Sequence, residues 1–266
     1  MNGLLLFLLN VCRNRGLISS LVRNDLRQRY IGTAGGLLWA LIQPLVLIST
    51  YWFVFTYGLK VGVISDSPFI LYFVCGFVPW MMFSDGITQS SAMIVNNPHL
   101  VKKVIFPTEL LPIVNQTVQL ALHLIALAIV AILLIAYQWP MTWYVLQLPY
   151  YTVCALALGL GFGWLTSALN VFFRDIGQVV NVVLGLWFWL TPIVWPLEIL
   201  PPLLRSIMGL NPTYYIVQGY RDSLLIGVPI WDRPGQMLQF WAMAMILLFL
   251  GAHVFRRLKR DFVEVL

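Results

Sequence analysis

The chain has 266 residues, of which 60% are hydrophobic and only 10% are charged, with a formal net charge of +6. Its mean hydropathy is +0.85. Because soluble domains are typically about 25% charged and about 45–50% apolar, these values exclude a soluble globular domain, a disordered chain, a collagen-like repeat and a disulfide scaffold. The composition predicts an all-α polytopic membrane protein.

Six runs with few or no charged residues are long enough to cross a bilayer, which takes roughly 20 apolar residues per helix. The longest, residues 110–173, has no Asp, Glu, Lys or Arg and suits two spans separated at Tyr137–Pro140. The predicted transmembrane helices are residues 36–57, 69–95, 113–136, 145–170, 176–195 and 236–255. With residues 1–35 as an N-terminal segment, they form a single domain over residues 1–266.

The segment 196–235, between the fifth and sixth spans, is rich in proline. It holds two helical pieces, about 203–210 and 213–226, and Asn211-Pro212 between them is typical of a cap followed by proline at the first helical position. Each piece is too short to cross a bilayer. We interpret both as re-entrant or interfacial helices on the periplasmic side.

The lysines and arginines predict the orientation, because these residues accumulate on the cytoplasmic side of a span. With both termini inside, four cations lie outside, at Lys60, Arg205, Arg221 and Arg233. Twelve lie inside: Arg13, Arg15, Arg23, Arg27, Arg29, Lys102, Lys103, Arg174, Arg256, Arg257, Lys259 and Arg260. The basic balance therefore reflects membrane topology, and we expect no nucleic-acid binding.

Two segments predicted on the inner side contain helices that do not cross the membrane. Residues Leu17–Tyr30 form a basic amphipathic helix, which either anchors the chain to anionic lipid or takes part in function. In the inner loop between the second and third spans, Asn97 can cap a helix, Pro98 can start it and Pro107 ends it. This two-turn helix is suited to docking into a groove on another protein, unless it is an ordinary loop with anchoring lysines.

Polar residues inside the spans are further candidates. Asp85 is a costly carboxylate in the second span, and it should face protein, a cavity or water. In the third span Asn115, Gln119 and His123 recur every four residues and so share one face, which either joins helices or lines a pathway. Small residues recur in the fourth span and predict close helix packing: Ala155, Gly159, Gly163 and Ser167.

Aromatic residues lie at mid-depth as well as at the membrane edges. The apolar faces of sugar rings can stack on such side chains, so an aromatic pathway could pass a glycan without holding it tightly. Packing against helices or lipid is the alternative for each ring. The candidates are Tyr51, Trp52, Trp80, Trp187 and Trp189.

Common catalytic and metal-binding signatures do not occur. The sequence has no Gly-x-x-x-x-Gly-Lys-Ser/Thr phosphate loop, no Gly-x-Ser-x-Gly and no His-Glu-x-x-His. Its cysteines and histidines lack metal-ligand spacing. We therefore expect no catalytic residue, no bound metal and no cofactor in this chain.

Several motifs, taken together and in order, give the chain a resemblance to the membrane-spanning subunits of bacterial ABC exporters for polysaccharides. This family moves O-antigen, capsule and teichoic acid, and the likeness is greatest to the O-antigen type. The motifs are Asp25-Leu-Arg-Gln-Arg-Tyr-Ile-Gly32, Leu37-Leu-Trp-Ala-Leu-Ile-Gln-Pro44, Gly76-Phe-Val-Pro-Trp80 with Phe83-Ser84, Asn97–Lys103, Phe106-Pro-Thr-Glu109, Leu169-Asn-Val-Phe-Phe-Arg-Asp175, Thr191-Pro-Ile193, and Asn211-Pro212 with Tyr220-Arg221.

The resemblance implies a channel of two copies in the bacterial inner membrane, driven by two copies of a cytosolic ATPase that binds ATP and Mg. The substrate would be a polysaccharide on undecaprenyl diphosphate, and other partners would be membrane lipids. The coupling helix to the ATPase would consist of Pro98, His99, Leu100, Val101, Lys102, Lys103, Val104 and Ile105.

Our own inference adds residue roles to that scheme. The diphosphate needs cations at the inner interface, and the candidates are Arg27, Arg29 and Arg174, with Lys102 and Lys103 nearby. The glycan pathway would use Asp85 and the mid-depth aromatic residues. The alternatives are an ABC exporter subunit for capsule, teichoic acid, lipid or drug, an intramembrane glycan-modifying enzyme, and a channel that conducts alone.

Overall fold

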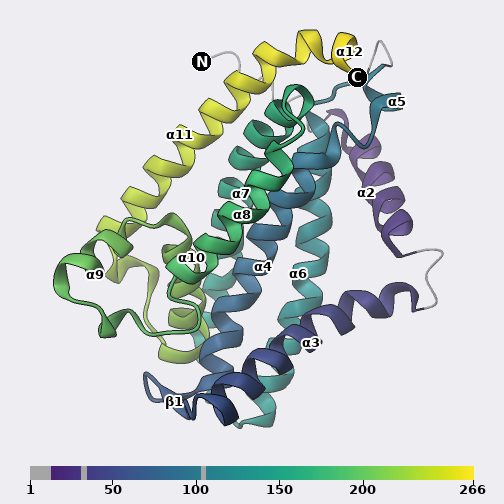
Figure 1. The fold of residues 1–266 in the computed structure, drawn as a ribbon. Helices are drawn as coiled ribbons and strands as arrows, with labels where there is room; N and C mark the ends of the chain where they lie inside the picture. The colour runs from purple at the N-terminus through teal and green to yellow at the C-terminus, as the bar shows by residue number, and fades with distance from the viewer. Residues whose placement is uncertain (1–12, 31–34, 103–105) are drawn as a thin grey trace.

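The structure is a computed structural model that describes residues 13–30, 35–102 and 106–266. It is a helical bundle, as the composition predicts (Figure 1). The longer helices are α3 (Trp39–Phe53), α4 (Phe69–Met93), α6 (Leu110–Ala136), α7 (Leu148–Phe172), α8 (Ile176–Leu190) and α11 (Pro234–Leu258). The shorter ones are α2 (Arg15–Tyr30), α5 (Pro98–Val101), α9 (Pro202–Gly209), α10 (Pro212–Arg221) and α12 (Phe262–Val265).

Within the described residues, five helical segments are long and apolar enough to cross a membrane. They are Trp39–Gly58, Phe69–Met93, Leu110–Ala136, Trp143–Phe172 and Pro234–Val265. They correspond to five of the six predicted spans, and the predicted break after the third is confirmed, because α6 ends at Ala136. The chain is therefore a multi-pass membrane protein.

The remaining predicted span is shorter than expected. Helix α8 has 15 residues and ends at Leu190, where the prediction continued to residue 195. Thr191 leaves the helix with extended backbone and donates its hydroxyl to the Trp187 carbonyl, and Pro192 cannot continue the helical hydrogen bonds. At about 1.5 Å per residue, α8 is roughly 22 Å long, less than the roughly 30 Å of the hydrocarbon core.

Three segments predicted to be cytosolic lie at one end of the bundle, here called the basic end: the loop that holds α5, the turn between α7 and α8, and the C-terminal residues after α11. Helices α5 and α12 lie there in Figure 1. The opposite end holds a short hairpin with two residues in each strand, which was not predicted from the sequence. The hairpin pairs β1 (Val63–Ile64) with β2 (Ser67–Pro68), and Ser65 and Asp66 turn it with positive φ angles. The structure thus groups the two sides as predicted without showing which compartment each faces.

Helix α4 forms the centre of the bundle, packed between α6, α7, α8 and α10. The predicted stripe of small residues on α7 faces this helix and α6. A Cβ atom added at Gly159 would lie 2.9 Å from the Gln116 amide, and one at Gly163 would lie 2.9 Å from the Ser90 hydroxyl. The close packing predicted from these small residues is confirmed.

A second close contact joins α7 and α11. A Cβ atom added at Gly251 would lie 2.4 Å from the carbonyl oxygen of Gly161, which is backbone and cannot move aside. Helix α11, at the left of Figure 1, is held against α7 at this point, while much of its other surface is exposed. Such exposure is expected of a helix that faces lipid.

The segment after α8 folds back over the bundle as α9 and α10. Asn211 caps α10 as predicted, because its side-chain oxygen accepts a hydrogen bond from the Thr213 backbone at 3.0 Å. The same oxygen accepts from the Trp187 indole at 3.0 Å, which fixes the cap to the end of α8. Helix α10 is mostly buried, whereas α9 is mostly exposed.

Arg221 was counted in the sequence only as an outer-side cation, and the structure adds that its side chain is buried, with 1% exposed. Its guanidinium donates to the carbonyl oxygens of Tyr72 (3.2 Å), Pro192 (2.8 Å) and Ile193 (2.7 Å), and it lies 3.5 Å from the centre of the Tyr72 ring. The next residue, Asp222, is also buried and pairs with Arg233 at 3.2 Å.

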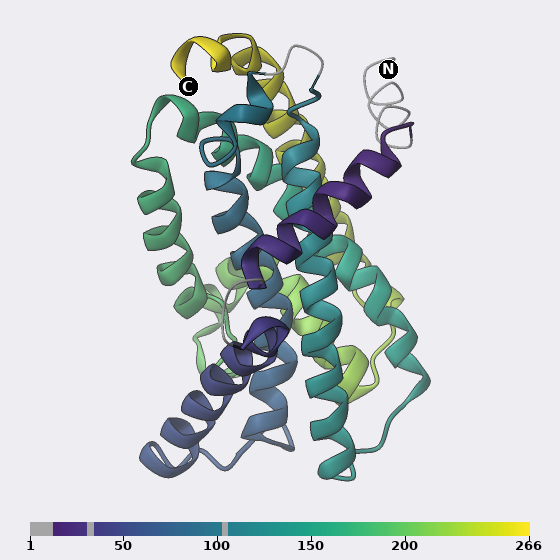
Figure 2. The ribbon, with the colours of Figure 1, turned by 90° about the vertical axis from the view of Figure 1, so that its right-hand side faces the viewer.

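The N-terminal helix α2 crosses α6 obliquely (Figure 2), and α3 then diverges from the bundle. Arg29 of α2 donates to Asp25 at 2.8 Å and to the side-chain oxygen of Asn115 at 3.0 Å, which attaches α2 to α6. Leu21 and Val22 pack against the basic end of the bundle. Part of the predicted lipid-facing side of this helix therefore contacts protein.

Candidate functional site

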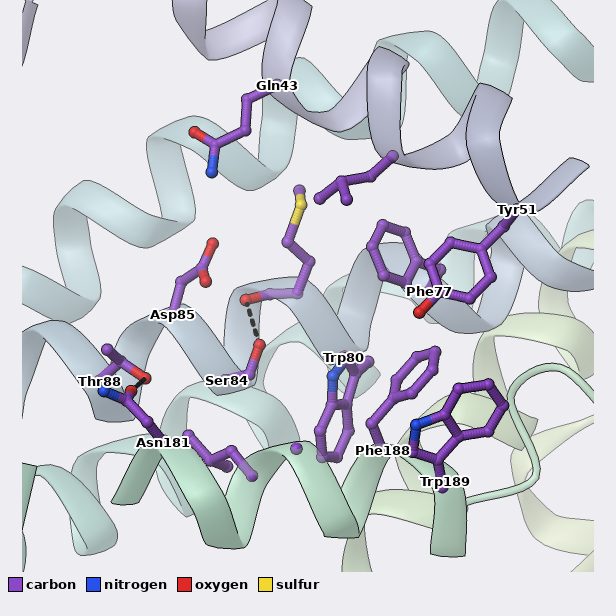
Figure 3. Close-up of a pocket in the computed structure, with 14 residues that line it drawn as sticks. Gln43, Tyr51, Phe77, Trp80, Ser84, Asp85, Thr88, Asn181, Phe188 and Trp189 are labelled. Carbon is purple, nitrogen blue, oxygen red and sulfur yellow. Dashed lines mark hydrogen bonds between the residues drawn. The ribbon is translucent and has the colours of Figure 1, made fainter. Parts of the chain in front are cut away.

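A pocket of about 380 Å³ opens between α3, α4 and α8 (Figure 3). Its place follows from the divergence of α3, which leaves the adjoining surfaces of α4 and α8 partly uncovered. The lining residues are Gln43, Leu47, Tyr51, Phe77, Trp80, Met81, Ser84, Asp85, Thr88, Asn181, Leu184, Gly185, Phe188 and Trp189.

One half of the pocket is aromatic. The Tyr51 ring lies 6.0 Å from Phe77 and 5.7 Å from Phe188, measured between ring centroids. Trp80 lies 5.9 Å from Phe188, and Phe188 lies 5.4 Å from Trp189 in an edge-on arrangement. These rings come from three helices and form a continuous surface on which flat apolar faces can stack.

The other half of the pocket is polar. Ser84, Asp85 and Thr88 project from the part of α4 nearer the basic end, and Asn181 projects from the corresponding part of α8. Gln43, in the first half of α3, reaches toward Asp85 in Figure 3. Thr88 donates to the Asn181 side-chain oxygen at 3.4 Å. The pocket therefore changes from polar to aromatic with distance from the basic end.

A second feature is an apolar cluster at the basic end, here called the basic-end cluster. It joins the loop helix α5 to the ends of α4, α6, α7 and α11 and to α12, all of which contribute buried side chains. The members are Met93, Ile94, Val101, Leu111, Val114, Trp164, Ala168, Val171, Phe255 and Phe262. Helix α5 is therefore packed against the bundle through this cluster.

The loop helix itself has an exposed side and a buried side. His99 and Lys102 are exposed, Leu100 is half-buried and Val101 is 5% exposed within the basic-end cluster. The described helix is one turn, Pro98–Val101, and Lys102 is its C-cap. Of the predicted coupling helix, Lys103, Val104 and Ile105 lie outside the described residues. Asn97 occupies the predicted cap position, but its side chain donates to the Met93 carbonyl instead.

Glu109 ties the loop after α5 to the C-terminal end of the chain. Its carboxylate pairs with Lys259, and its backbone carbonyl accepts a hydrogen bond from the Trp164 indole at 3.1 Å. The same loop is thus bonded to α7 and to the turn between α11 and α12. These contacts make the basic end one connected unit rather than a set of separate loops.

Comparison with known proteins identifies the class of membrane protein. Residues 16–225 match the family described as ABC-2 type transporter. The chain belongs to this family. It is 30% identical to the O-antigen export system permease protein RfbA of Myxococcus xanthus over 253 residues, covering 94% of this chain and 95% of that protein.

Two further relatives of this ABC-2 permease come from other bacteria. The O-antigen export system permease protein RfbA of Klebsiella pneumoniae is 26% identical, over 94% of this chain and 95% of its own length. The polysialic acid transport protein KpsM of Escherichia coli is 23% identical, over 90% and 92% respectively. The resemblance to polysaccharide-exporting permeases inferred from the motifs is confirmed, and the chain is a transporter subunit rather than an enzyme.

The structure brings together four of the six residues predicted for the glycan pathway of this permease. Tyr51, Trp80, Asp85 and Trp189 all line the pocket. Trp187 faces away from it and donates to Asn211, while Trp52 packs edge-on against Tyr57 with ring centroids 5.6 Å apart.

Two polar residues that line the pocket with Asp85 were not predicted from the sequence. These residues are Gln43 and Asn181. Like Asp85, each is a polar residue inside an apolar predicted span, so the same criterion could have identified them. The polar stripe on α6 lies elsewhere and joins helices. Asn115 donates to the Gly86 carbonyl at 2.8 Å, and the His123 ring lies 2.7 Å from the Tyr220 hydroxyl.

The three arginines predicted to bind the lipid diphosphate differ in their surroundings. Arg27 and Arg174 are exposed, Arg27 on α2 and Arg174 in the turn between α7 and α8. Arg29 is half-buried and bonded to Asp25 and Asn115. Arg29 therefore has a structural task that the sequence pattern did not reveal.

Proposed function

We propose that this ABC-2 permease forms the membrane channel for a polysaccharide linked to undecaprenyl diphosphate, and exports it from the cytoplasm as O-antigen exporters do. The observation that carries the proposal is the 30% identity, over 94% of the chain, to the O-antigen export permease of Myxococcus xanthus. The aromatic half of the pocket adds support. Its rings offer stacking surfaces to sugars without the dense hydrogen bonding that would hold them tightly.

The proposal includes the assembly implied by the family. Two copies of the chain would enclose the channel, with six crossings each and both termini in the cytosol of the bacterial inner membrane. Two copies of a separate cytosolic ATPase, with bound ATP and Mg, would dock below. The exposed side of α5, with His99 and Lys102, is suited to that contact, and buried Val101 would pass the motion to the basic-end cluster.

A capsule polysaccharide is the second candidate substrate, favoured by the similarity to the polysialic acid transport protein KpsM. The lower identity of 23%, against 30% for the Myxococcus protein, makes it the weaker one. The two candidates share the same machinery and differ in the glycan that is carried.

A strain that lacks this chain tests the proposal. We expect such cells to lose the surface glycan and to accumulate undecaprenyl-diphosphate-linked glycan on the cytoplasmic side, and we expect a plasmid copy to restore export. Extraction of the lipid-linked glycan together with surface immunostaining would measure both pools. Normal surface glycan in the deletion strain would contradict the proposal.

The contrast between Arg27 and Arg29 gives a separate prediction. Arg29→Ala should lower stability by about 1–2 kcal/mol, because it removes the hydrogen bond to Asn115 that attaches α2 to α6 and the bond to Asp25 within α2. Arg27→Ala should leave stability within about 0.5 kcal/mol, as for most exposed positions, yet reduce export several-fold if Arg27 binds the diphosphate.

Thermal unfolding in detergent and surface glycan measured in the same strains would separate the two effects. Arg27→Lys, which keeps the positive charge, is the matched control and should retain most of the export. Full export by Arg27→Ala would remove this residue from the proposed diphosphate site.

A further inference from the structure

The pocket carries a single charged side chain among its described lining residues. Among the residues that the structure describes, Asp85 is the only charged side chain lining it, and no Lys, Arg or His does. Asp85 is exposed toward the pocket, and Figure 3 shows its carboxylate directed into the space below Gln43. The other polar groups there are neutral amides and hydroxyls.

The cation that acts on Asp85 does not cancel this charge. Arg29 interacts electrostatically with Asp85, but its guanidinium is bonded to the Asp25 carboxylate at 2.8 Å and to Asn115 at 3.0 Å. Asp25, Arg29 and Asp85 together carry a net charge of −1. A ligand in the pocket would therefore meet an uncompensated negative charge in a site bounded by apolar helices.

A carboxylate in this position treats sugars differently according to their charge. Hydroxyl and ammonium groups can donate hydrogen bonds to it, and such charge-assisted bonds are stronger than neutral ones. An anionic sugar would meet repulsion that low-dielectric surroundings strengthen and that no cation in the pocket lining offsets. Gln43, Thr88 and Asn181 can bond to either kind of sugar, so Asp85 decides between them.

We propose that Asp85 makes this pocket a charge filter, which admits neutral or amino-bearing sugar chains and rejects chains with a carboxylate on each sugar. The inference rests on the proposed export of a glycan and adds the chemical class of that glycan. It also separates this chain's substrate from a polyanionic capsule, because both would use the same aromatic surface but only the neutral chain would pass Asp85 without repulsion.

A matched pair of probes tests the filter. Hexagalacturonate and its fully methyl-esterified form have the same backbone and differ in carboxylate charge. Binding of each to the purified complex of this chain with its ATPase, in lipid nanodiscs, can be followed by tryptophan fluorescence, because Trp80 and Trp189 line the pocket. We expect the ester to bind at least tenfold more tightly than the acid.

Two variants assign that preference to the pocket. Asp85→Asn keeps the shape of the side chain and should reduce the preference to less than threefold, mainly by improving binding of the acid. Asp66→Asn removes the same charge from the exposed hairpin and should leave the tenfold preference unchanged.

Equal binding of the two probes to the wild-type protein, or an unchanged preference in Asp85→Asn, would overturn the charge filter while leaving glycan export intact. Failure of both probes to bind would overturn the filter as well, since the pocket would then not be a glycan site. Whether the chain exports a glycan at all would still be decided by the deletion strain.

Discussion

Replacing Arg221 by leucine should destabilise the protein by about 3–5 kcal/mol, because three buried carbonyl oxygens would lose a hydrogen bond to a charged donor. The guanidinium donates hydrogen bonds to the backbone carbonyl oxygens of Tyr72, Pro192 and Ile193. Leucine has no donor, so all three oxygens would lose these bonds. Because an unmet buried polar group costs about 1–3 kcal/mol, the loss should be severe even though leucine is apolar.

The expected consequence is local as well as global. Arg221 fixes α10 to α4 and to the turn after α8, so its loss should release the folded-back segment first. Limited proteolysis between α8 and α11, together with thermal unfolding in detergent, would measure this. Arg221→Lys should rescue only partly, since an ammonium lacks the planar fork that reaches three acceptors.

Arg205→Leu is the matched control for this experiment. Arg205 lies in the same segment on α9, but it is exposed and bonds to carbonyls of its own neighbourhood, Glu198 at 2.7 Å and Leu200 at 3.3 Å. Its replacement should change stability by less than about 0.5 kcal/mol. Equal stability of the Arg221→Leu and Arg205→Leu proteins would show that the buried guanidinium is not a structural anchor.

Replacing Phe262 by alanine should uncouple the basic end from the rest of the bundle. Phe262 is completely buried, and its ring lies 5.5 Å from Phe255 and 6.1 Å from Phe172. Phe→Ala substitutions in cores typically cost about 3–5 kcal/mol. Because the same cluster holds Val101, the loop helix α5 would lose the packing behind it.

We expect the Phe262→Ala protein to export little glycan while still co-purifying with the ATPase, since the exposed side of α5 is unchanged. Surface glycan and pull-down of the ATPase would be measured in the same cells. Val263→Ala is the neighbouring control, because Val263 is exposed and should tolerate the change. Normal export by Phe262→Ala would mean that force does not pass through the basic-end cluster.

The spans could be predicted from sequence because a helix that crosses a membrane requires a long run of apolar residues. A charge-free run of sufficient length has few alternatives, and the turn at Tyr137–Pro140 is polar and proline-bearing. The end of α8 was harder to predict, because Ile193, Val194 and Trp195 are as apolar as a spanning helix. Ile193 and Val194 are instead buried in a turn after Pro192, and hydropathy cannot distinguish the two.

Long-range partners could not be read from sequence for a different reason. Arg221 stands beside Asp222 in a short predicted helix of a proline-rich segment, and nothing near it in the sequence indicates that it bonds to a carbonyl 149 positions away. Tyr51 and Trp52 are equally good channel candidates from composition, but successive helical residues point about 100° apart. Which of them faces the pocket depends on how α3 lies against α4, and no local pattern contains that information.

Reconstitution is the most direct test of the central claim, that this chain provides the pathway and a separate ATPase provides the energy. Proteoliposomes would carry undecaprenyl-diphosphate-linked glycan in the outer leaflet, and protection of the glycan from added glycosidase would report its movement to the lumen. We predict movement with the chain, the ATPase, ATP and Mg together, and none with the chain alone or with an ATPase that cannot hydrolyse ATP. Movement by the chain alone, without nucleotide, would contradict the account.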